Sequence, residues 1–151
     1  MISDEEKLRT VVQAAEIFIC YDAFGDEPDP RTYITEIGNV APLAIIPPDK
    51  EFDPKEFGLS LLGEHGNKRV VIFIPGRAFD YSGTRHGRGG GWYDRLLSGI
   101  PKSWVRVGVT HEDRISKELL ERKNWDEPVD YLLVEKASSW EVKKTGSRND
   151  S

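Results

Sequence analysis

The residues best suited to chemistry lie in a glycine- and arginine-rich stretch, residues 83–91. Five of its nine residues are glycine and two, Arg85 and Arg88, are arginine. Glycine lets the backbone approach a ligand closely, and arginine forms charge-assisted hydrogen bonds to oxyanions. Successive free backbone N–H groups in such a turn also bind phosphate. The stretch therefore predicts a phosphate-binding loop, with an ordinary solvated turn as the alternative.

Individual residues of this stretch have distinct expected roles. Arg85 and Arg88 would clamp phosphate oxygens, and His86 could hydrogen-bond to the same group. Asp94 would hold Mg²⁺ bridging the phosphates, because a hard dication prefers carboxylate oxygen; the alternative is a carboxylate at a helix N-terminus. Tyr93 is expected to pack under the loop as part of the cofactor site. The backbone donors would come from Gly87, Gly89, Gly90 and Gly91.

Two common nucleotide signatures do not account for the loop. A Walker loop needs Gly-Lys followed by Ser or Thr, and the chain has no such run. A dinucleotide fingerprint places its glycines directly after a strand, whereas this cluster begins well past Pro75, where the preceding apolar run ends. The loop must therefore belong to another class of phosphate site.

The loop and its flanks resemble the signature of the 5-formyltetrahydrofolate cyclo-ligase family (methenyltetrahydrofolate synthetase). The resemblance covers residues 68–136 and continues more weakly through 105–109 and 125–130. It implies a three-layer α/β fold, related to sugar-phosphate isomerases and CoA transferases, and the cofactors ATP and Mg²⁺. The matching residues are Pro75, Gly76, Ala78, Phe79, Asp80, Gly83, Arg85, Gly87, Gly89, Gly91, Tyr93, Asp94 and Arg95.

The reaction implied by this resemblance is the ATP-dependent closure of 5-formyltetrahydrofolate to 5,10-methenyltetrahydrofolate. The formyl oxygen attacks the γ-phosphate, the neighbouring amine then attacks the activated carbon, and phosphate leaves. The protein contributes positioning and charge stabilisation, with Arg85 as the candidate catalytic residue. No side chain needs to act as a nucleophile.

Several positions depart from the family pattern, namely His86, Arg88, Trp92 and Trp125. Residues 1–67 also do not match the longer N-terminal half of the family, which helps to hold ATP and shapes the folate pocket. We therefore expect the nucleotide end of the site to be retained and ligase activity to be weak or lost. The alternatives are a noncatalytic nucleotide- or phosphate-binding module of the same fold, or a site for a sugar phosphate or CoA-like ligand.

The strongest strand patterns are the apolar runs at residues 70–75, 104–109 and 130–135. With a helix expected at 113–123, they predict adjacent parallel strands whose carboxyl ends carry the glycine loop. The short stretch 92–97 should be a helix. The fold class is thus α/β, a mainly parallel sheet with helices on both faces, in a single domain over residues 1–138.

The remaining patterns are less regular. Helical spacing after the Ser3 capping box predicts a helix over residues 4–19. Residues 31–37 suggest a short strand, 43–46 a better one, and 51–64 at most a brief helix. The polar stretch 139–151 is predicted to be a disordered tail.

Composition limits the classes of partner. The chain has 151 residues and a net charge of −5, which argues against nonspecific nucleic-acid binding. Residues 76–106 nevertheless carry six basic residues against two acidic ones, a local excess that suits a small polyanion. The lone Cys20 is expected in the core, and no run is long enough to span a membrane. We expect a cytoplasmic protein that binds a nucleotide, either alone or together with a reduced folate; a homo-oligomer is compatible with the sequence.

Overall fold

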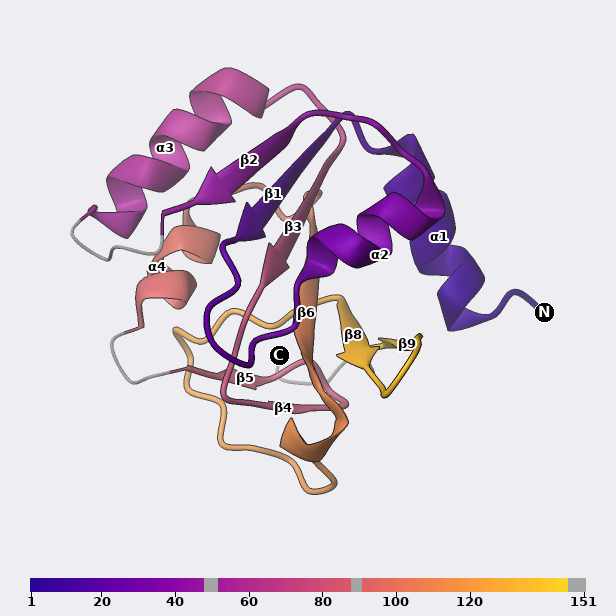
Figure 1. Cartoon of the computed structure of the whole chain (residues 1–151). Coiled ribbons are helices and arrows are strands. Elements are labelled where there is room, and N and C mark those ends of the chain that lie inside the picture. The colour runs from indigo at the N-terminus through magenta and orange to yellow at the C-terminus, as the bar shows by residue number, and fades with distance from the viewer. Residues whose placement is uncertain (48–51, 88–90, 147–151) are drawn as a thin grey trace.

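The computed structural model describes residues 1–47, 52–87 and 91–146 of the chain. A six-stranded sheet with the order β2-β1-β3-β6-β8-β9 forms its centre, and helices cover both faces (Figure 1). The helices α1 and α2 lie on one face, and α3 and α4 lie on the other. The expected three-layer α/β architecture is confirmed.

The three strongest predicted strands are adjacent and parallel, as expected. They are β3 (Val70–Ile74), β6 (Val105–His111) and β8 (Tyr131–Glu135). In the register, Phe73 lies opposite Val107 and Val109 lies opposite Leu133. Continuous β-branched and aromatic runs form these strands because both of their faces are buried.

Alternate side chains of β1 (Ile17–Tyr21) enter the two halves of the core. Ile17 and Ile19 pack with α3 and α4, whereas Phe18 and Cys20 pack with α1 and α2. The period-two alternation of a strand produces this division. Burial raises the pKa of the Cys20 thiol to about 12, and the charge of Asp29 adds to this effect, so Cys20 is the inert core residue that the sequence predicted.

The predicted helix over residues 4–19 is wrong over its last five residues, 15–19. The helix α1 (Asp4–Ala14) begins at the Ser3 cap as expected, with the Glu6 N–H donating to Ser3 Oγ over 3.1 Å. It ends before Ile17 because the following five residues are the central strand β1, which pairs in parallel with β2 (Leu43–Ile46) and β3. Burial between two neighbouring strands overrides the helical spacing of the apolar residues.

Two further segments are more helical than predicted. Residues 31–37 are not a strand but belong to α2 (Pro30–Ile37), which is capped by the Asp29 carboxylate and ends at Gly38 with φ 90°. The helix α3 (Pro54–His65) is 12 residues long rather than brief, and Asp53 caps it. In both cases an aspartate followed by proline marks the first turn, a start signal that outweighed weak apolar periodicity.

The expected helix over residues 113–123 is absent from the described structure. A 3-10 turn, η1 (Glu112–Arg114), leads to the short strand β7 (Ile115–Ser116), and the rest of the stretch is irregular. The Leu120 N–H donates to Asp80 Oδ2 over 2.7 Å instead of continuing a helix. Contacts to a neighbouring hairpin therefore replaced the intrahelical hydrogen bonds.

The predicted disordered tail is also wrong over residues 140–144. These residues form β9 (Trp140–Lys144), antiparallel to β8, with Val142 buried opposite Leu133. Its outward residues are charged, as is typical of a sheet edge that avoids further pairing. Residues 147–151 lie outside the described part of the chain.

A second, three-stranded sheet with the order β5-β4-β7 lies at the carboxyl end of the main sheet (Figure 1). It contains β4 (Ala78–Asp80) and β5 (Arg85–His86). The fully buried Phe79 ring joins it to β6: a Cβ on Gly108 would lie 2.4 Å from Phe79 Cε1, and one on Gly76 would lie 2.8 Å from Phe79 Cζ. Glycine at these two positions lets the ring fit.

Candidate functional site

The ends of the glycine loop lie at the carboxyl edge of the main sheet, as the sequence predicted. The loop leaves β5 after His86 and enters α4 (Trp92–Ser98) after Gly91, whose φ of 66° is left-handed. The Arg85 Nε donates to the carbonyl of Pro75, the residue that follows β3. This bond fixes the loop against the end of a central strand, which is where open α/β sheets hold ligands.

Arg85 is a buried cation, with only 8% of its surface exposed. Its guanidinium carbon lies 4.8 Å from the centre of the Tyr93 ring. Gly87 also lies against the guanidinium, since a Cβ added to it would come within 2.8 Å of an Arg85 terminal nitrogen. Tyr93 and Gly87 therefore hold the guanidinium in one orientation, and Gly87 is glycine because the arginine occupies the place of a side chain.

Arg85 has no carboxylate within ion-pair distance among the described residues. Burial lowers its pKa, and the nearby charge of Asp94 is the main opposing influence. A buried charge without a paired counter-ion is unfavourable, and an anion bound beside it would relieve that penalty. Arg85 is thus suited to meeting a negatively charged ligand.

Asp94 lies on α4, one residue after Tyr93, and is 9% exposed. Its Oδ1 accepts a hydrogen bond from the Glu127 N–H over 3.0 Å. Burial raises the pKa of Asp94, and the neighbouring carboxyl of Asp126 contributes in the same direction. Two carboxyl groups at one edge of the loop fit a dication that retains waters and phosphate oxygens, so Asp94 and Asp126 would hold Mg²⁺. Among the described residues no group of three or more acidic, histidine or cysteine side chains forms a denser metal site.

Asp94→Asn is expected to separate metal binding from stability. Asparagine keeps an acceptor for Glu127 N–H but cannot ionise, so Mg²⁺ should no longer strengthen nucleotide binding. Because the raised pKa means that the fold favours the neutral acid, ionisation costs stability as pH rises through that value, and the ligand-free variant should melt at or above the wild-type temperature at pH 7. Calorimetric titration of ATP with and without Mg²⁺, together with thermal melting, measures both effects.

The pH dependence of the Mg²⁺ effect on nucleotide binding provides the internal control for Asp94→Asn. In the wild type, the enhancement by Mg²⁺ should decline as pH falls through the raised Asp94 pKa, since protonation removes the ligand. Asp113→Asn, at an exposed aspartate in η1, should leave the enhancement unchanged. If Mg²⁺ strengthened nucleotide binding as much in Asp94→Asn as in the wild type, Asp94 would not be a ligand of the metal.

The segment that binds Asp94, residues 121–127, is anchored to the protein at several points. Glu127 Oε1 lies 3.0 Å from the Arg106 terminal nitrogen in an ion pair with both side chains largely buried. At the other end, His86 Nε2 lies 2.7 Å from the Glu121 carbonyl, and Arg122 Nε donates to Thr84 Oγ1 over 2.9 Å. These contacts connect the segment to both sides of the glycine loop, and they give His86 a structural partner.

A second wall of the site was not found from the sequence. The loop between β1 and α2 brings Glu27 close enough for its charge to raise the pKa of both Tyr21 and Tyr93, in addition to the larger effect of burial. Tyr21 OH donates to the Pro28 carbonyl, which holds this loop against the end of β1. Nothing local to Glu-Pro-Asp at residues 27–29 indicates that the charge of Glu27 acts on Tyr93.

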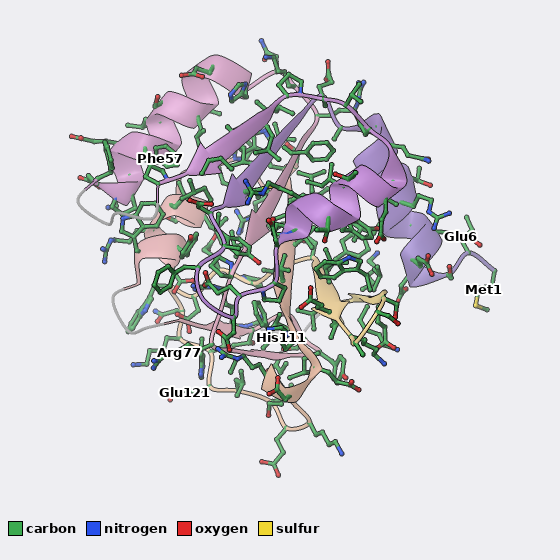
Figure 2. All side chains as sticks on the ribbon, in the orientation of Figure 1. Met1, Glu6, Phe57, Arg77, His111 and Glu121 are labelled. Atoms are coloured by element: carbon green, nitrogen blue, oxygen red, sulfur yellow. The ribbon has the colours of Figure 1, made fainter. Side chains whose placement is uncertain are left out.

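The other predicted ligands are only partly described by the structure. Arg88, Gly89 and Gly90 lie outside the described residues, so their roles stay predictions. Arg77, at the start of the hairpin, is exposed and lies at the same lower end of the molecule as Glu121 (Figure 2). The carboxylates of Asp126 and Asp130 accept the N–H groups of Lys123 and Arg106, each over 2.9 Å.

Comparisons with known proteins agree with this architecture. The model of the 5-formyltetrahydrofolate cyclo-ligase family matches residues 45–135. A 5-formyltetrahydrofolate cyclo-ligase of Haemophilus influenzae is 39% identical over 69 residues, which are 45% of this chain and 36% of that protein. The alignment thus spans little more than a third of the relative's length.

Two solved structures share the fold. A 5,10-methenyltetrahydrofolate synthetase of Aquifex aeolicus superimposes with a TM-score of 0.59 at 23% identity, covering 99% of this chain and 88% of that one. A 5,10-methenyltetrahydrofolate synthetase of Mycoplasma pneumoniae gives 0.57 at 16% identity, covering 87% and 80%. Among the described helices of this chain, none combines the length and the apolar character needed to cross a membrane.

Proposed function

The chain belongs to the 5-formyltetrahydrofolate cyclo-ligase family, and we propose that it binds MgATP between the β4–β5 hairpin and α4. The observation that carries this proposal is the buried Arg85 guanidinium, which packs against Tyr93 and Gly87 and has no carboxylate at ion-pair distance among the described residues. A polyphosphate would supply the missing counter-charge through charge-assisted hydrogen bonds. The two carboxyl groups of Asp94 and Asp126 would hold the magnesium of the same ligand.

The reaction that we propose for this site is the ATP-dependent closure of 5-formyltetrahydrofolate to 5,10-methenyltetrahydrofolate. The formyl oxygen displaces ADP from the γ-phosphate, the neighbouring amine adds to the activated carbon, and phosphate departs with the original formyl oxygen. Arg85 would stabilise the charge that develops on the transferred phosphoryl group, because it is oriented before the ligand arrives. Because it already packs against the Tyr93 ring and Gly87, little rearrangement is needed when the ligand binds.

The reduced folate would contact the Tyr93 side of the site. Tyr93 and Asp94 are successive residues of α4 with different neighbours. Tyr93 interacts electrostatically with Arg85, Glu27 and Tyr21, whereas Asp94 accepts a hydrogen bond from the Glu127 N–H. Glu27 offers a hydrogen-bond acceptor and Tyr21 and Tyr93 offer apolar ring surface, which suits a pterin ring with its amino donors. The γ-phosphate of ATP and the formyl group of the folate would then both lie next to Arg85.

A noncatalytic nucleotide-binding module is the second candidate function. It is favoured by the short alignment, since the chain matches 36% of the Haemophilus influenzae relative and residues 1–44 lie outside the family match. A site that lacks part of the folate pocket would bind nucleotide but would not hold the formyl oxygen in line with the γ-phosphate. That loss of positioning removes several kcal/mol of catalysis.

A paired measurement distinguishes the two functions. Calorimetry should detect MgATP binding at submillimolar to millimolar concentration, and absorbance should show 5,10-methenyltetrahydrofolate forming from 5-formyltetrahydrofolate more slowly than about 1 s⁻¹. Product without added ATP, or no nucleotide binding at millimolar MgATP, would overturn the proposal. MgATP binding with no product above the background rate would assign the chain to the noncatalytic class.

A further inference from the structure

The segment 121–127 runs along the mouth of the glycine loop and carries one exposed aromatic side chain. His86 anchors its first residue on the β5 side of the loop, and Asp94 anchors its last residue on the α4 side. Figure 1 shows this stretch of the chain passing from below β4 toward β8, beside the ends of β5 and α4. Trp125 lies between the two anchors and is 62% exposed.

Trp125 has a defined local environment despite its exposure. The Lys123 N–H donates to Asp126 Oδ2 over 2.9 Å, which closes a turn around residues 123–126. Lys123 Nζ lies 5.2 Å from the centre of the Trp125 ring, a cation–π contact. The indole is therefore presented from a closed, anchored turn rather than from a free loop.

The position of Trp125 relates it to the phosphate side of the site. Two residues after Trp125, the Glu127 N–H donates to Asp94 Oδ1 over 3.0 Å, so the chain next to Trp125 reaches the proposed magnesium ligand. The charge of Glu27 acts on the pKa of Tyr93, the residue that precedes Asp94 on α4. If the phosphates of a ligand contact Arg85 and Asp94, the rest of that ligand extends either toward Tyr93 and Glu27, where the folate is proposed to bind, or toward Trp125.

We propose that Trp125 is the stacking platform for the nucleobase of the bound nucleotide. This inference rests on the proposed MgATP site. Exposed aromatic rings bind bases through their π faces, and the adjacent Lys123 adds positive charge near the phosphates. Arg85 would then recognise the polyphosphate, and Trp125 would distinguish a nucleotide from inorganic polyphosphate.

The test compares MgATP with magnesium tripolyphosphate, which has the phosphates and no base. Trp125→Ala should weaken MgATP binding roughly five- to a hundredfold, the range of one base–aromatic stack, while tripolyphosphate affinity stays within about twofold of wild type. Trp125→Phe should recover most of the MgATP affinity. Leu119→Ala, at an exposed apolar residue just outside the segment, is the matched control and should change neither ligand.

Fluorescence provides a second readout that a loss of folding would not imitate. Trp92 and Trp104 are 8% and 1% exposed and Trp140 is partly buried, so Trp125 should account for most acrylamide-accessible emission. MgATP should protect this emission and tripolyphosphate should not. Equal weakening of both ligands in Trp125→Ala, or unchanged MgATP affinity, would overturn the platform while leaving the phosphate site in place. Failure of the wild type to bind either ligand would overturn the proposed function and this inference together.

Discussion

Arg85→Ala is expected to weaken MgATP binding about 10- to 150-fold. The loss of a charge-assisted, two-pronged contact to phosphate corresponds to about 1.5–3 kcal/mol. Tyr93 and Gly87 already orient the guanidinium in the free protein, so the side chain loses little further conformational entropy when the ligand binds. Isothermal titration calorimetry with MgATP measures the change directly.

Two further variants establish that the effect of Arg85 is specific. Arg77→Ala removes an exposed arginine from the same hairpin and should alter affinity less than threefold, because a solvated charge outside the site acts only at long range. Arg85→Lys keeps a positive charge but lacks the planar fork, so it should recover only part of the affinity. Equal losses in Arg77→Ala and Arg85→Ala would indicate general electrostatic attraction, and no loss in Arg85→Ala would contradict the proposed site.

Asp80→Ala is expected to be the most destabilising change considered for this fold. Asp80 is 1% exposed, and its carboxylate accepts hydrogen bonds from Ser82 N and Oγ, Thr84 N and Leu120 N. It therefore joins the β4–β5 turn to the irregular stretch after β7. Its removal takes the acceptor from one buried donor and three part-buried donors, and the free energy of unfolding should fall by about 3–5 kcal/mol.

The pH dependence of stability should report the same carboxylate. Burial alone would raise the pKa of Asp80, but the hydrogen bonds from Ser82, Leu120 and Thr84 outweigh it and lower the pKa. A lowered pKa means that the stabilisation is complete above the unfolded-state value of about 3.9 and is lost as pH falls through the folded-state value. Asp80→Ala should abolish this component of acid unfolding.

Urea denaturation followed by circular dichroism at several pH values tests both the loss of unfolding free energy in Asp80→Ala and the loss of its pH dependence. Asp113→Ala, at an exposed aspartate, is the matched control and should stay within about 0.5 kcal/mol of wild type. Asp80→Asn should lie between the two, since it keeps acceptor capacity without the charge. A free energy of unfolding for Asp80→Ala within 1 kcal/mol of wild type would show that the turn does not depend on this carboxylate.

The position of the loop could be predicted because its signal is local. Glycine spacing and the two arginines predicted a phosphate loop at a strand end, and the structure places Arg85, Gly87 and Gly91 at the carboxyl edge of the sheet, whereas phosphate binding stays a prediction. The sequence did not indicate the burial of Arg85, which depends on Tyr93 eight residues later. Nor did it find Glu27, because the approach of the β1–α2 loop to α4 involves residues far apart in the chain.

The errors in the fold share one physical cause. Residues 17–19 continue the helical spacing of α1, and residues 113–123 have a helical apolar face, yet neither is helical in the structure. Their hydrogen-bonding partners lie elsewhere: β1 pairs with β2 and β3, and the Leu120 N–H bonds to Asp80. When backbone N–H and C=O groups form hydrogen bonds with residues far away in the chain, the local spacing of apolar residues does not indicate it.

The sequence by itself determined the class of the fold, the central strands β3, β6 and β8, and the position of the glycine loop. Long apolar runs can be buried in few ways, and glycine and proline limit the backbone wherever they occur. Only the tertiary structure decided that 140–144 completes the sheet, that residues 121–127 bridge the loop, and that Asp94 sits beside Asp126. Each of these depends on the free energy of contacts between residues distant in the chain, which no single segment encodes.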